Sequence, residues 1–137
     1  MQKCVVDRFS PLLLVMALSA CATAKAPGPI ADYCTAVVGE VRACGESFEK
    51  GSPTSAAIDA CGDLSAISEA KMRTALALIP KDSPLRLKTS LTSAYAHLYV
   101  AALHIGAATK ASLTDPNLRA IRDAVIRDCA EITSSTP

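Results

Sequence analysis

The strongest constraint on the fold is a proline signal that occurs three times in the chain. Ser52-Pro53, Ser83-Pro84 and Asp115-Pro116 each place a capping side chain directly before a proline. Serine and aspartate are favoured at the N-cap of a helix, and proline is favoured at its first position, so each pair predicts a helix start. With the segment before the first signal, they predict four helices, at about residues 29–48, 53–79, 84–110 and 116–132.

Apolar residues recur at steps of three and four in each segment, as in an amphipathic helix that packs on a core. In the second segment Gly62 interrupts this pattern, and we expect a break or kink there. The residues expected to face the core are Ile30, Cys34, Val37, Val41, Cys44 and Phe48 in the first segment, Ile58, Cys61, Leu64, Ile67, Met72, Leu76 and Ile79 in the second, Leu87, Leu91, Ala94, Tyr95, Leu98, Ala102 and Ile105 in the third, and Leu118, Ile121, Val125, Cys129 and Ile132 in the fourth.

The connections between these segments are short, and short loops favour antiparallel neighbours. Alanine is abundant and runs of β-branched residues are short, which favours helix over strand. The expected fold is therefore all-α, an up-down-up-down four-helix bundle over residues 30–132. The Ser- and Thr-rich residues 133–137 are expected to form a disordered tail.

The first twenty residues have the layout of a secretory signal peptide. Lys3 and Arg8 give a weakly basic start, residues 12–18 form an apolar core, and small residues follow. The apolar run is much shorter than the roughly 20 residues that span a bilayer, which argues against a permanent transmembrane helix. We expect residues 1–20 to be removed on export.

The end of this segment, Leu18-Ser19-Ala20-Cys21, resembles the lipobox of bacterial lipoproteins. The resemblance implies cleavage before Cys21 and transfer of a diacylglyceryl group to its sulfur, with a further acyl chain such as palmitate. Two or more acyl chains anchor a protein firmly. Residues 21–29 would then be the lipidated cysteine and a tether. The alternative is an ordinary signal, cut after Ala22 or Ala24.

This resemblance also implies a location, the extracytoplasmic face of a bacterial membrane. In bacteria with two membranes, an aspartate after the lipidated cysteine is the usual signal for retention in the inner membrane. Ala22 stands there in this chain, which permits sorting to the outer membrane.

Six cysteines occur in the chain, of which Cys4 lies in the signal peptide and Cys21 would carry the lipid. An even number then remains in an exported domain, which indicates two disulfides. A zinc site is the alternative, but the spacings are wide and contain no Cys-x-x-Cys pair. The four remaining cysteines are Cys34, Cys44, Cys61 and Cys129.

The expected topology selects one pairing of these four cysteines. Cys34 and Cys44 lie about 15 Å apart on one helix, whereas a disulfide needs Cα atoms within about 7 Å. In an up-down bundle the start of the first helix lies beside the end of the fourth, which pairs Cys34 with Cys129. The end of the first helix lies beside the start of the second, which pairs Cys44 with Cys61.

Composition excludes several classes of partner. The chain has 14 Lys and Arg and 13 Asp and Glu, and removal of residues 1–20 leaves 12 of each sign. A neutral chain with interspersed charges lacks the basic footprint of a nucleic-acid-binding protein. Aromatic residues make up only 4% and tryptophan is absent, which argues against base-stacking or sugar-binding surfaces.

Four side chains of the third segment are weak candidates for ligand binding: His97, His104, Tyr95 and Tyr99. Histidine and tyrosine both ligate haem iron, although no Cys-x-x-Cys-His attachment motif is present. The two histidines are about 10 Å apart along the helix, so they cannot share a metal without help from another helix. Their polar surroundings favour solvent-facing histidines.

Motifs that carry catalysis are missing from the sequence. There is no Gly-x-Ser-x-Gly, no phosphate-binding glycine loop and no His-Glu-x-x-His. We therefore expect no catalytic residues, no metal site, no enzyme activity and no cofactor besides the lipid on Cys21. The predicted function is a membrane-anchored, non-catalytic interaction module that binds another envelope protein. The alternative is a carrier or sensor of a small apolar or haem-like ligand.

Overall fold

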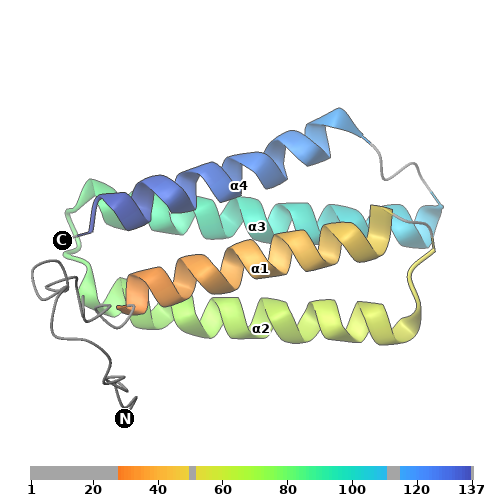
Figure 1. The fold of residues 1–137 in the computed structure, drawn as a ribbon, viewed down its shortest axis with the longest axis horizontal. Helices are drawn as coiled ribbons and strands as arrows, with labels where there is room; N and C mark the ends of the chain where they lie inside the picture. Colours follow the sequence, from red (N-terminus) through yellow and green to blue (C-terminus); the bar gives the residue numbers. More distant parts are fainter. Residues whose placement is uncertain (1–27, 50–51, 111–114, 137) are drawn as a thin grey trace, which may run out of the picture.

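A computed structural model describes residues 28–49, 52–110 and 115–136, and its regular structure there is entirely helical. The four helices lie lengthwise against one another (Figure 1). In these ranges α1 and α3 each contact all the other helices, whereas α2 and α4 do not contact each other. The all-α prediction is confirmed. The helices are α1 (Pro29–Glu49), α2 (Ser55–Leu78), α3 (Pro84–Thr109) and α4 (Pro116–Ser134).

The helix starts follow the proline signals in two of three cases. Ser83 and Asp115 cap α3 and α4, and each side chain accepts a hydrogen bond from a backbone N–H of the first turn. At α2 the cap is Thr54, not Ser52, because the Thr54 hydroxyl accepts from the Ala57 N–H at 3.2 Å. Helix α2 therefore starts two residues later than predicted, and it continues without a break through Gly62.

The core lies mainly between α1, α3 and α4. Helix α2 adds only small buried side chains, at Cys61, Ser68 and Ala75. The large side chains of the core come from the predicted stripes of α1 and α4 and from an unpredicted face of α3. The largest apolar ones are Tyr33, Val37, Val41, Phe48, Tyr99, Leu103, Val125 and Ile132.

The predicted inward face of α3 is wrong. Leu87, Leu91, Leu98 and Ile105 are 64%, 46%, 55% and 65% exposed, and Tyr95 lies beside them. Ala94 is exposed as well, and Ala102 is half-buried. The opposite face is buried instead, at Thr89, Thr92, Ser93, Ala96, Tyr99, Val100, Leu103 and Gly106.

The buried face of α3 carries mostly small side chains, and its threonine hydroxyls form hydrogen bonds within the helix, which explains why this face can be buried. Thr89 and Thr92 donate hydrogen bonds to the carbonyls of Leu85 and Lys88, at 2.8 and 2.9 Å. Their hydroxyls therefore enter the core without losing hydrogen bonds, which removes most of the cost of burial. A count of leucines alone therefore predicts the wrong buried face of α3. The face with the threonines can be buried because their hydroxyls do not need hydrogen bonds from water.

The ends of the last two helices are also defined. Lys110 caps α3 in the left-handed conformation, at φ 55°. Helix α4 extends to Ser134, two residues into the segment predicted as a tail, and Thr133 and Ser134 donate hydrogen bonds to the carbonyls of Cys129 and Glu131.

Among the described helices, none has the length and apolar character needed to cross a bilayer.

Candidate functional site

Several predicted features lie outside the residues that the structure describes. These are the signal peptide at 1–20, the lipidation site Cys21, and the tether up to residue 27. They stay predictions.

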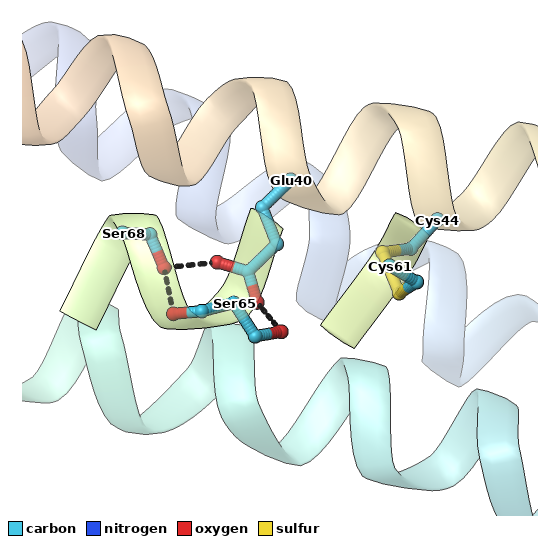
Figure 2. Close-up of a disulfide and its surroundings, with 5 residues drawn as sticks. All are labelled: Glu40, Cys44, Cys61, Ser65 and Ser68. Atoms are coloured by element: carbon cyan, nitrogen blue, oxygen red, sulfur yellow. Dashed lines mark hydrogen bonds between the residues drawn. A yellow bond between two sulfur atoms is a disulfide. The ribbon is translucent and has the colours of Figure 1, made fainter. Parts of the chain in front are cut away.

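The predicted disulfide between Cys44 and Cys61 is present. It joins α1 to α2 with a Cα–Cα distance of 5.5 Å, and both cysteines are buried (Figure 2). Cys44 lies in the second half of α1 and Cys61 in the first half of α2, so this end of the helix pair is covalently closed.

A buried carboxylate lies one turn from this disulfide. Glu40 of α1 is fully buried and accepts hydrogen bonds from two α2 hydroxyls, Ser65 at 2.5 Å and Ser68 (Figure 2). This cluster was not among the features predicted from the sequence. The sequence spacing does indicate it. Glu40 precedes Cys44 by four residues and Ser65 follows Cys61 by four, so both side chains lie one helical turn from the disulfide.

This cluster joins α1 to α2 through side-chain hydrogen bonds. A buried charge is tolerated only where hydrogen bonds or counter-charges compensate its lost hydration. The two serine hydroxyls supply that compensation and so fix the register of α2 on α1. Glu40 has no exposed surface in this arrangement.

The second predicted cysteine pair is close together but unbonded. Cys34 of α1 and Cys129 of α4 are buried free thiols. A hydrogen bond from the Cys129 thiol lowers the pKa of Cys34, and the same hydrogen bond, with burial, raises the pKa of Cys129. Both thiols line a hollow of about 690 Å³ between α1 and α4. Its other lining residues are Ala31, Thr35, Val38, Gly39, Arg42, Ile126, Ala130, Thr133 and Ser134.

The four candidate ligand-binding residues do not form one site. His97 and Tyr95 are exposed on the outside of α3. His104 is half-buried, and its ring packs edge-on against Phe48 with centroids 5.0 Å apart, so the expectation of a solvent-facing histidine fails there.

Tyr99 points into the core and is fully buried. Its hydroxyl lacks a hydrogen-bond partner in the described part of the chain, and burial raises the pKa of Tyr99. The Arg122 side chain lies beside it without hydrogen-bond geometry. Within residues 28–49, 52–110 and 115–136, no three His, Cys, Asp or Glu side chains are placed to hold a metal ion.

The feature best suited to binding is the outer stripe of α3, which we define as Leu87, Leu91, Leu98 and Ile105. All four side chains project into solvent over 19 residues of helix, from 87 to 105. From residue 87 to 109 the only charged side chain is Lys88, and it pairs with Glu131 of α4. The solvent-facing side of a helix is normally charged, and a continuous exposed apolar patch usually marks an interaction surface.

No protein-family model, curated protein or solved structure matches this chain.

Proposed function

We propose that this protein is a lipid-anchored, non-catalytic interaction module of the bacterial cell envelope. The observation that carries this proposal is the outer stripe of α3. Burial of each half-exposed leucine or isoleucine against a partner contributes about 1 kcal/mol, so the four together favour association by about 4 kcal/mol before its entropic cost. The binding surface is thus the face of α3 that the bundle itself leaves uncovered.

The lipobox-like residues Leu18-Ser19-Ala20-Cys21 support the anchor. A diacylglyceryl group on Cys21 would hold the mature chain at the extracytoplasmic face of the membrane. The seven residues from Ala22 to Gly28 reach at most about 25 Å, so α1 would start close to the lipid surface. Interaction through α3 would then take place near that surface.

The topology that we propose for this module is up-down-up-down. Contacts between the start of α1 and the end of α2 support it, since Asp32 lies 3.8 Å from Lys71. At the other end of α1, Glu49 lies 3.4 Å from Arg122, near the start of α4. Alternating helix directions account for both pairs.

A second disulfide, Cys34–Cys129, belongs to the same proposal. The two thiols already lie together, and an exported protein meets disulfide oxidants that accept the two electrons and two protons released when the bond forms. Alkylation of the native protein after denaturation without reductant tests it. No labelled thiol should be found at either position, and full labelling of both would contradict it.

Two experiments test the function. Metabolic incorporation of a tagged fatty acid should label the wild-type protein and not Cys21→Ser. Chemical cross-linking in intact cells should trap the protein in a larger complex, and Leu98→Glu should abolish that complex. Ile67→Glu is the matched control, since Ile67 of α2 is similarly exposed, at 51%. Equal loss in both variants, or no complex in the wild type, would refute a specific role for α3.

The hollow between α1 and α4 favours a second candidate, a carrier of an apolar ligand with an anionic group. Its walls are mostly small or apolar, and Arg42 on its rim makes no ion pair with any described residue. A fluorescent fatty acid should bind the wild type and bind more weakly to Val38→Trp, which fills the hollow. Equal binding by both proteins would remove this candidate.

A further inference from the structure

We propose that the partner of the outer stripe is a second copy of this chain, whose own α3 packs antiparallel across it. This inference rests on the proposed function, because it names the occupant of the same surface. It follows from the spacing of large and small residues along the exposed face of α3.

The exposed face of α3 carries a heptad pattern. Leu91, Leu98 and Ile105 are seven residues apart, and alanines follow each of them by three residues, at positions 94, 101 and 108. Leu87 precedes Leu91 by four. A seven-residue repeat of apolar positions is the signature of a helix that packs lengthwise against another helix. None of the four described helices covers this face, since these positions are exposed.

The alternation of large and small residues selects an antiparallel partner. In a parallel pair with equal register, Leu98 would meet Leu98 and Ala101 would meet Ala101. That arrangement sets layers of two large side chains next to layers of two alanines, which fill space less evenly than mixed layers do. In an antiparallel pair each leucine can lie opposite an alanine instead.

One register satisfies this pattern over the central part of the stripe. With a two-fold axis at residue 96, Leu98 lies opposite Ala94 of the second copy, and Leu91 lies opposite its Ala101. At the two ends Leu87 lies opposite Ile105. The face is therefore complementary to itself, as a two-fold interface between identical chains requires. The alanines also let the two helices approach closely.

Charge is compatible with this partner, and the area predicts a weak association. Between residues 87 and 109 the only charged side chain of α3 is Lys88, and it pairs with Glu131 of its own chain, so the middle of the stripe carries no charge; Lys81, Asp82 and Arg86 lie near its Leu87 end. The stripe is about 27 Å long and would bury on the order of 400 Å² per copy. Since stable interfaces bury about 800 Å² per partner, association should be weak in dilute solution and stronger when both copies are anchored in one membrane.

Photo-cross-linking of the full mature lipoprotein tests this arrangement. Leu98 is replaced by benzoylphenylalanine, and equal amounts of unlabelled and ¹⁵N-labelled protein are reconstituted together in phospholipid vesicles. We expect mixed-isotope adducts that join position 98 to residues 91–97 of the other copy. Adducts only to lipid, adducts within one chain, or adducts far from residue 94 would each overturn the proposal.

Two further variants distinguish a specific interface between the two α3 helices from non-specific hydrophobic association. Ala101→Leu adds apolar surface but fills the space that Leu91 of the second copy needs, so the yield of mixed-isotope adducts should fall about tenfold. A yield that stays equal or rises would refute the register. Ile67→Glu should leave the yield unchanged, and thermal unfolding should show that both variants keep the fold.

The same cross-linker in intact cells distinguishes the two proposals. If position 98 couples only to a different envelope protein, self-association fails and the proposed function stands. If it couples to no protein at all, both proposals fail.

Discussion

The close contact between Gly45 of α1 and Tyr99 of α3 predicts a large coupling between two conservative substitutions. A Cβ atom built at Gly45 would overlap the Tyr99 hydroxyl, whereas the ring carbon Cζ lies 3.5 Å away, an ordinary contact. The hydroxyl itself is buried without a hydrogen-bond partner among the described residues. The obstacle to a methyl group at position 45 is therefore a single oxygen atom.

The expected magnitudes follow from this geometry. Tyr99→Phe removes an unsatisfied buried hydroxyl and should stabilise the fold by about 1–3 kcal/mol. Gly45→Ala gains about 1 kcal/mol of helix propensity, but in the wild type the overlap costs about 1–3 kcal/mol. The single Gly45→Ala variant should thus be neutral or destabilised by up to about 2 kcal/mol. In the Tyr99→Phe background it should instead be stabilising, by about 1 kcal/mol.

Urea denaturation of the wild type, both single variants and the double variant measures this coupling. We expect an interaction free energy of about 1–3 kcal/mol in favour of the double variant. If Gly45→Ala has the same effect in both backgrounds, within about 0.5 kcal/mol, the packing of α1 on α3 described here is incorrect.

Three other outcomes are expected. Replacement of both Cys44 and Cys61 by alanine should lower the free energy of unfolding in urea by about 3 kcal/mol from loop entropy alone, since 17 residues separate them; no loss would contradict their bond. Glu40→Ala should cost about 2–4 kcal/mol in the same assay, because it leaves a cavity and removes the acceptor of the Ser65 and Ser68 hydroxyls. Glu40→Gln should cost clearly less, and equal losses would argue against the hydrogen-bonded cluster. Lys88 lowers the pKa of Glu131 in the folded protein. This pair therefore stabilises the fold above the unfolded carboxyl pKa of about 4.3, and the stabilisation is lost as the pH falls through the lowered pKa. Lys88→Gln should raise the Glu131 pKa in an NMR titration, and an unchanged pKa would show that the pair does not form in solution.

Structural features that depend on nearby residues could be predicted from the sequence. Ser83-Pro84 and Asp115-Pro116 define helix starts because a cap and a proline satisfy the first turn by themselves. The Cys44–Cys61 bond followed from helix geometry and a short connection. The helix starts needed no knowledge of how the helices pack, whereas the cysteine pairing needed only that consecutive helices are antiparallel.

Features that depend on packing were missed. The orientation of α3 is decided by Thr89 and Thr92, whose hydroxyls bond to their own helix and so make a polar-looking face suitable for the core. Glu40 was missed for a related reason, because its partners Ser65 and Ser68 come from another helix. Counting apolar residues along the sequence cannot detect either effect, since both depend on which hydrogen bonds the folded chain makes.

The absence of contact between α2 and α4 in the described ranges has a consequence for how this protein can diverge. A substitution on α2 places no demand on the packing of α4, and the reverse also holds. A substitution on the inward side of α1 has to be accommodated by three neighbours at once. During evolution α2 and α4 should therefore change independently of each other, while the inward sides of α1 and α3, which each have three neighbours, change slowly.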